Sequence, residues 1–153
     1  MKILTTFTYH YLKMFRNIFL SSLPDNTELI FQYHNYDLRK CEGRLGAHDT
    51  LYKVPIILKV LESCEENELV FYADVDIVFL NKDLEDIVKR LEEKDIYIQL
   101  DDNNNGVCLG CMVLRNTENT RNIFKKFLEL KVEEVLKNYG FIVRVSSYLS
   151  VKI

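Results

Sequence analysis

Residues 69–73 form an uninterrupted apolar run with the sequence Leu-Val-Phe-Tyr-Ala. Such a run is typical of a strand buried on both faces, because helices cover both sides of the sheet in an α/β fold. The run leads directly into Asp74. Since ligands of α/β sheets bind at the carboxyl ends of the strands, Asp74 lies where a binding site is expected.

Strand and helix patterns alternate along the rest of the chain. Residues 2–8 are rich in β-branched side chains and predict a strand, and apolar residues at helical spacing follow in residues 12–20. After a turn signal at Pro24, residues 28–33 predict a second strand, so the chain opens with a βαβ unit. The same reasoning predicts helices at 51–61, 84–91 and 117–136, and strands at 95–100 and 107–115. This alternation predicts an α/β sheet with helices on both faces.

Local signals refine the helix boundaries. Residues 35–49 are polar and contain two glycines, which predicts a surface loop. Pro55 then fits the first turn of the helix that follows, where the missing N–H has no partner in any case. Thr117 can cap the last helix with its hydroxyl.

The chain has 153 residues, the size of one ordinary domain, so residues 1–153 are interpreted as a single unit. It carries 20 Lys and Arg residues against 23 Asp and Glu residues, a net charge of −3. This balance does not build the broad positive field that nucleic-acid binding needs, so no nucleic-acid partner is expected.

The four cysteines indicate a reducing, cytoplasmic setting, because a chain of this size does not need disulfide bonds. Cys108 and Cys111 form a C-x₂-C pair, but without a second pair or a neighbouring histidine they indicate buried thiols rather than a zinc site. Charged residues interrupt the apolar N-terminal stretch, so neither a signal peptide nor a membrane span is expected.

Asp74-Val75-Asp76 places two carboxylates in a segment that is otherwise apolar from Leu69 to Leu80. In an extended chain, the side chains of residues i and i+2 point to the same side, about 7 Å apart. Two hard oxygen donors at that spacing suit Mg²⁺ or Mn²⁺, which would in turn hold a diphosphate. The alternative is a solvated turn after a buried strand, with both aspartates exposed.

Residues 71–80, Phe-Tyr-Ala-Asp-Val-Asp-Ile-Val-Phe-Leu, resemble the D-x-D segment of GT-A type glycosyltransferases, in particular the nucleotide-diphospho-sugar transferase group. Residues 52–55 before this segment, and residues 95–99 and 110–117 after it, stand in the order that the group shows. The resemblance covers about residues 1–140. It implies a Rossmann-like GT-A fold, a three-layer α/β/α sandwich around a mostly parallel central sheet, with an incomplete C-terminal part.

The resemblance also implies roles for residues around the nucleotide. Asp76 would be the direct ligand of Mn²⁺ or Mg²⁺, and Asp74 would reach the metal shell or the ribose. Thr8 and Tyr9 would lie beside the base of a UDP- or GDP-sugar, and Lys53 would approach its phosphates. From the residues alone, Lys53 could instead be a solvent-facing helix residue and Tyr9 a core residue.

Three further residues would contact the donor sugar. Gln99 and Asp101 share one face of a strand by the two-residue period, and the resemblance places that face against the sugar. Gly110 lies inside a predicted strand, where a glycine often marks a close approach of another group to the backbone. The resemblance implies that the donor sugar is that group.

The implied reaction is transfer of a sugar from a nucleotide-diphosphate donor to an acceptor hydroxyl, with the metal stabilising the charge that grows on the β-phosphate. The residues assign neither a catalytic base nor an acceptor. The family would usually continue after Gly140 with an Asp-Gln pair and a later metal-binding histidine, whereas residues 141–145 read Phe-Ile-Val-Arg-Val here and the three histidines, His10, His34 and His48, all lie upstream.

Two alternatives remain open. The first is a truncated, non-catalytic remnant that binds a nucleotide-sugar, with an open sheet edge that would favour pairing into a homo-oligomer. The second is a phosphatase of the haloacid dehalogenase type, in which Asp74 and Asp76 would be the nucleophile and the acid/base.

Overall fold

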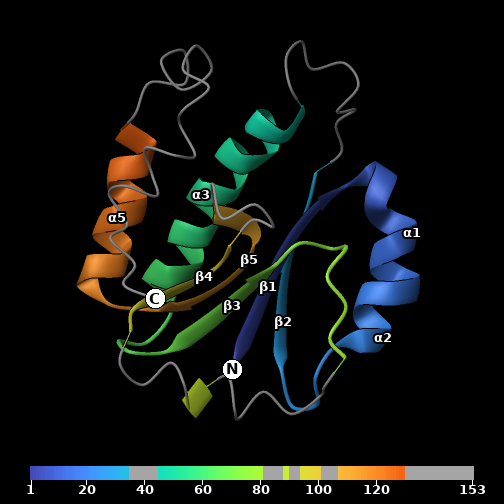
Figure 1. The fold of residues 1–153 in the computed structure, drawn as a ribbon, viewed down its shortest axis with the longest axis horizontal. Coiled ribbons are helices and arrows are strands. Elements are labelled where there is room, and N and C mark those ends of the chain that lie inside the picture. The colour runs from blue at the N-terminus through green and yellow to red at the C-terminus, as the bar shows by residue number, and fades with distance from the viewer. Residues whose placement is uncertain (35–44, 81–87, 90–93, 101–106, 130–153) are drawn as a thin grey trace.

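The computed structural model describes residues 1–34, 45–80, 88–89, 94–100 and 107–129. The strands within these ranges form one five-stranded sheet in the order β2-β1-β3-β5-β4 (Figure 1). In chain order the strands are β1 (Lys2–Thr8), β2 (Glu28–His34), β3 (Leu69–Ala73), β4 (Ile96–Leu100) and β5 (Val107–Arg115). The five strand predictions are therefore confirmed, with boundaries within one residue.

The direction of the strands matches a mostly parallel sheet. β1 pairs in parallel with both β2 and β3, and β5 pairs antiparallel with both β3 and β4. Four strands therefore point the same way and β5 alone is reversed. The reversal follows from the short connection between β4 and β5, because a parallel crossover needs a dozen or more residues.

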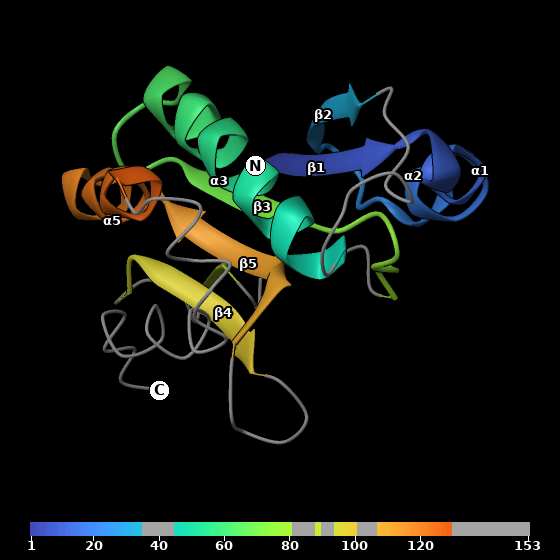
Figure 2. The same cartoon turned by 90° about the horizontal axis from the view of Figure 1, so that it is seen from above.

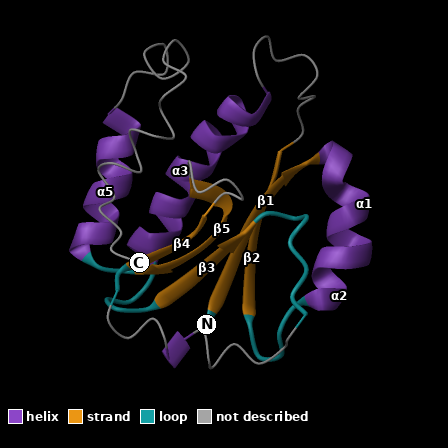
Figure 3. Ribbon diagram, in the orientation of Figure 1, coloured by secondary structure: helices purple, strands orange, loops and turns teal. Residues whose placement is uncertain are grey.

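Helices cover both faces of the sheet, as Figures 2 and 3 show. One layer contains α3 (Leu45–Ser63) and α5 (Glu118–Glu129). The opposite layer is one continuous helical segment made of a 3₁₀ turn at Tyr9–Tyr11, α1 (Leu12–Met14), a π-helical turn at Phe15–Phe19 and α2 (Leu20–Ser22). The predicted α/β/α sandwich is confirmed.

Two apolar cores fill the spaces between these layers. The core under α3 and α5 takes Leu4 from β1 and Val70 and Tyr72 from β3. The core under the first helical segment takes the alternate residues Ile3 and Phe71 of the same strands. Each strand thus contributes side chains to both cores, which is why the segment Leu69–Ala73 has no polar position.

The predicted start of α3 is wrong. The helix begins at Leu45, so Pro55 lies inside it and not in its first turn, and residues 45–49 of the predicted loop are helical. A helix can tolerate an internal proline when tertiary packing stabilises it, and the neighbouring residues Val54 and Ile57 are buried in the core. The predicted helix at 84–91 and the residues beyond 129 of the last predicted helix lie largely or wholly outside the described residues.

The cap predicted for α5 is confirmed. The backbone N–H of Thr120 donates to the side-chain oxygen of Thr117 at 3.2 Å. In the part of the chain that the structure describes, no helix combines the length and the apolar character that crossing a bilayer requires.

Candidate functional site

Asp74 is the first residue after β3 and lies at the carboxyl edge of the sheet, where β1 also ends (Figure 1). Its backbone N–H donates to the carbonyl of Gly110 on β5 at 2.7 Å. This bond holds the backbone of Asp74 to the sheet after the ladder of β3 has ended. The carboxylate is therefore presented from a fixed point.

Two neighbouring side chains engage the Asp74 carboxylate. Lys53 of α3 places its ammonium nitrogen 2.7 Å from Oδ1 and 2.7 Å from Oδ2. The hydroxyl of Tyr72, which is fully buried, donates to Oδ1 at 2.8 Å. The side chains of Lys53 and Asp74 are only 15% and 25% exposed, so this is a partly buried ion pair rather than a surface contact.

The same network extends to β1. The hydroxyls of Thr6 and Tyr72 lie 3.1 Å apart, and the ammonium of Lys53 lies 5.7 Å from the centre of the Tyr72 ring. Tyr72 therefore contacts the carboxylate through its hydroxyl and the ammonium through its ring. The negative face of the aromatic ring attracts the ammonium electrostatically.

Gly110 is where another group approaches the backbone closely, as predicted, and that group is the Asp74 carboxylate. A Cβ at Gly110 would lie 2.8 Å from Oδ2 of Asp74 and 3.3 Å from the sulfur of Cys108. The glycine sits in a bulge, because the β5 partner of β4 changes from Met112 to Cys108 between successive β4 residues. Bulges of this kind are frequent next to active sites.

Asp76 does not have the geometry expected for an extended chain. The N–H of Ile77 donates to the carbonyl of Asp74 at 2.9 Å, so Val75 and Asp76 form the centre of a turn. Val75 is buried in the core beneath the first helical segment, and Asp76 is exposed. The predicted alternative of a solvated turn is thus right for Asp76 and wrong for Asp74.

The segment after the turn explains this arrangement. Phe79 packs edge-on against Phe71 and Phe19, with ring centres 5.4 Å and 6.1 Å apart. Val75, Ile77 and Phe79 all contact the same core, so the residues between them face outward. Burial of these alternate apolar side chains agrees with the turn after Asp74, and Figure 3 shows the loop that follows β3 in teal.

The structure places the other predicted site residues as follows. Thr8 ends β1 and is buried, and its hydroxyl has no hydrogen-bond partner within the described ranges. Tyr9 begins the next helical turn and is 56% exposed, so it is not a core residue. Gln99 is exposed on β4, opposite Cys108. Asp101 lies outside the described residues.

Tyr72 and Thr6 are the site residues that the sequence analysis missed. Tyr72 stands two positions before Asp74. Because side chains alternate along a strand, this spacing could have predicted that the two side chains face the same side. Its aromatic ring led to its interpretation as core alone. Thr6 carried no comparable signal, because its approach to Tyr72 depends on the pairing of β1 with β3.

The donors at this edge fit Mg²⁺ or Mn²⁺ in their chemistry. Such an ion takes one or two protein carboxylates and fills its other positions with phosphate oxygens and water. The Lys53 ammonium against both oxygens of Asp74 shows that this position accommodates a cation, and Asp76 offers a second, exposed carboxylate. Among the described residues, no three His, Cys, Asp or Glu side chains converge into a complete all-protein metal cage.

The Cys111 thiol lies near this edge without joining the network. Burial is the main cause that raises its pKa, and electrostatic interactions with Cys108 and Asp74 raise it further. Cys64, Cys108 and Cys111 are free thiols. The Cys111 thiol is therefore kept protonated, which agrees with a packing role for this side chain.

No family model and no curated protein matches the sequence. Solved structures do share the fold. The glycosyltransferase GlyE of Streptococcus pneumoniae TIGR4 matches in its apo form with a TM-score of 0.64 and 13% identity, over 97% of this chain and 42% of that chain. A second GlyE structure matches with a TM-score of 0.62 and 13% identity, over 99% and 43% of the two chains.

A third structure, the galactosyltransferase LgtC in complex with donor and acceptor sugar analogs, matches with a TM-score of 0.50 and 11% identity. It covers 96% of this chain and 66% of that chain. The chain therefore spans less than half the length of the GlyE structures. The fold of the chain is one that glycosyltransferases use.

Proposed function

We propose that the chain is a glycosyltransferase domain that binds a nucleotide-diphosphate sugar at the carboxyl edge of its sheet, together with Mn²⁺ or Mg²⁺. The observation that carries this proposal is the Asp74 carboxylate, which is held at that edge by Lys53 and Tyr72 in a fold that glycosyltransferases use. The general class rests on the fold. The metal, the UDP- or GDP-sugar donor and the transfer to an acceptor hydroxyl are parts of the proposal.

Each residue at this edge has a role in the proposal. Asp74 would hold the metal from the edge of the sheet, and Asp76 would reach it from the exposed turn that follows. The bound ion would supply positive charge to the diphosphate leaving group. Lys53 adds a positive charge for the phosphates. Thr8, whose buried hydroxyl lacks a partner in the described residues, and Tyr9 lie at the end of β1 beside the base.

The donor sugar then lies toward β4 and β5 in this proposal. Gly110 keeps that part of β5 free of a side chain, and its space is taken by the Asp74 carboxylate. Gln99 is exposed and can donate to or accept from sugar hydroxyls. The role of Asp101 rests on the sequence resemblance alone.

Binding of nucleoside diphosphates tests the proposal directly. Isothermal titration of the full chain with UDP and with GDP, in the presence of Mn²⁺ and in its absence, should show binding of one of them that depends on the metal. Asp74→Asn and Asp76→Asn should each weaken it by roughly tenfold or more, since changes around metal ligands commonly cost 10–100-fold. Glu129→Gln, an exposed carboxylate at the end of α5, is the matched control and should bind normally.

The proposal fails if neither nucleotide binds with Mn²⁺. It also fails if binding is independent of the metal and survives both aspartate substitutions. Hydrolysis or transfer of the sugar is measured separately, because donor binding and transfer are separable properties.

A further inference from the structure

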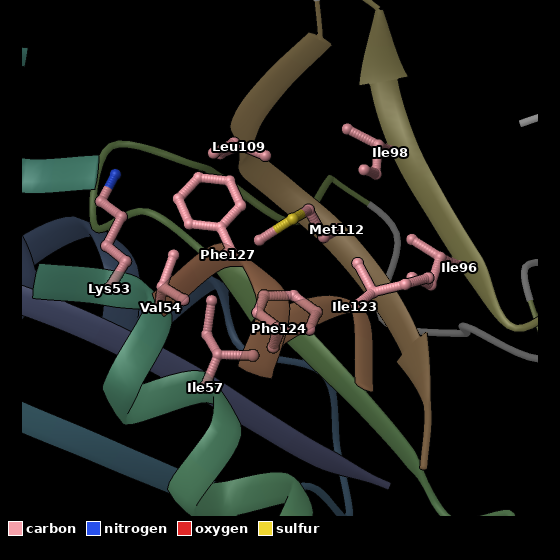
Figure 4. A pocket seen from close by; sticks show the side chains of 10 residues that line it. All are labelled: Lys53, Val54, Ile57, Ile96, Ile98, Leu109, Met112, Ile123, Phe124 and Phe127. Atoms are coloured by element: carbon pink, nitrogen blue, oxygen red, sulfur yellow. The ribbon is translucent and has the colours of Figure 1, made fainter. Parts of the chain in front are cut away.

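The side chain of Lys53 is largely buried, with 15% of its surface exposed. Figure 4 shows its stem beside the apolar side chains that line the cavity between α3, α5 and the sheet, with its nitrogen at the edge of that lining. A partly buried ammonium is costly unless an anion is close to it. Within the described residues, Asp74 is the carboxylate that lies within 4 Å of Lys53.

The Lys53 ammonium lies where a metal ion bound by the Asp74 carboxylate would lie. Its nitrogen is equidistant from the two oxygens of Asp74, at 2.7 Å from each, so it lies on the plane that bisects the carboxylate. A cation bound by both oxygens of a carboxylate occupies that plane. Tyr72 already engages Oδ1, and Oδ2 lies against Gly110, so Asp74 has little freedom to rotate toward another cation.

We infer that Lys53 is the resident counter-ion of Asp74 and that it exchanges with the divalent metal, so that metal binding at Asp74 requires the ammonium to leave. This inference rests on the proposed function and adds a coupling to it. When Lys53 leaves Asp74, its charge needs another anion, and a diphosphate bound to the same metal provides one. The metal alone therefore binds weakly, and the metal and the diphosphate strengthen each other's binding.

The exchange predicts that removing the Lys53 ammonium strengthens Mn²⁺ binding. A lysine with a purely structural role would not have this effect. Lys53→Met keeps most of the stem and removes the ammonium. Without metal, the variant leaves the Asp74 charge uncompensated and should unfold at a lower temperature than the wild type. With Mn²⁺ alone, it should bind the ion between about 5-fold and 150-fold more tightly, the usual span of a coupling between two sites.

The enhancement of Mn²⁺ binding by the nucleotide, UDP or GDP, should be smaller in Lys53→Met than in the wild type. Lys59→Met is the matched control, because Lys59 lies on the same helix and is exposed. It should leave the Mn²⁺ affinity and its enhancement by the nucleotide unchanged. Electron paramagnetic resonance of free Mn²⁺ measures the affinity without any activity assay.

Wild-type protein provides a second measurement that does not depend on the folding of a variant. Acetylation of Lys53 by an amine-reactive ester, followed by mass spectrometry, reports whether the ammonium is paired. Mn²⁺ alone should increase the reactivity of Lys53 relative to that of Lys59, and Mn²⁺ with the nucleotide should decrease it again. Unchanged Lys53 reactivity at saturating Mn²⁺ would overturn the exchange.

The two proposals fail in different ways. If the wild type binds no nucleotide with Mn²⁺, the proposed function fails, and the comparison of Lys53→Met with wild type in Mn²⁺ alone still decides the exchange. If the wild type binds the nucleotide and metal normally but Lys53→Met binds Mn²⁺ no more tightly than wild type, the exchange is wrong and the proposed function stands.

Discussion

The carboxylate of Asp74 occupies the space that a side chain on Gly110 would need. A Cβ on Gly110 would stand 2.8 Å from Oδ2 of Asp74, while the carbonyl of the same glycine accepts the Asp74 N–H at 2.7 Å. The glycine thus fixes Asp74 through its backbone and makes room for the charged group of Asp74. This relationship joins β5 to the end of β3 at the edge where the site is proposed.

Gly110→Ala should destabilise the protein by about 1–3 kcal/mol, the usual cost of an overpacked position. The added methyl group would collide with the Asp74 carboxylate, whose position Lys53 and Tyr72 restrain. Urea denaturation measures the free energy of unfolding. In an Asp74→Ala background the same glycine substitution should cost clearly less, and simple additivity of the two changes would contradict this origin of the strain.

Tyr72→Phe should lower the free energy of unfolding by about 1.5–3 kcal/mol, the range for a hydrogen bond to a charged group. The ring and its burial remain, while Oδ1 of Asp74 loses its hydroxyl donor and Thr6 loses a neighbour. Tyr11→Phe is the matched control, because Tyr11 is exposed on the first helical segment and should change stability by less than about 0.5 kcal/mol. Equal effects of the two substitutions would show that the buried hydroxyl contributes nothing.

Thr117→Ala should cost about 1 kcal/mol of stability through loss of the cap of α5. The Thr117 hydroxyl accepts from the N–H of Thr120 and lies 3.0 Å from the Thr120 hydroxyl. Thr117→Ser keeps the oxygen and should retain most of the stability. A serine variant as unstable as the alanine variant would assign the effect to the lost methyl group instead of the cap.

Alkylation of Cys111 by iodoacetamide should be slow in the folded protein. Its rate should rise only at a pH higher than the pH at which an ordinary thiol becomes reactive. Burial raises the pKa of this thiol, with smaller electrostatic contributions from Cys108 and Asp74, so the reactive thiolate is scarcer than usual at neutral pH. Asp74→Asn removes the Asp74 charge and should shift the pH profile of Cys111 alkylation downward. A profile that moves upward, or a folded protein that reacts as fast as the chain in urea, would contradict this.

Sequence patterns within a few residues were sufficient to predict most of the elements. The apolar run at Leu69–Ala73 predicted a doubly covered strand, and its side chains do divide between two cores. The cap at Thr117 was predicted for the same reason, since a cap is a contact over three positions. The helix that contains Pro55 started earlier than predicted, because packing against the sheet, and not the local preference of proline, decides how far that helix extends.

For Asp74 and Asp76, the sequence predicts the positions along the chain but not the contacts that the side chains make. That Asp74 stands at the end of a buried strand follows from the sequence alone, because hydrophobic periodicity determines which residues form strands and where those strands stop. Its meeting with Lys53, 21 positions away, and with Gly110 on β5 was decided by the tertiary structure. Those contacts depend on strand register and on how α3 packs across the sheet, and burial of Val75 and Phe79 directed Asp76 outward. Such relationships arise from the cooperative filling of two cores by the whole chain, and no short stretch of sequence contains them.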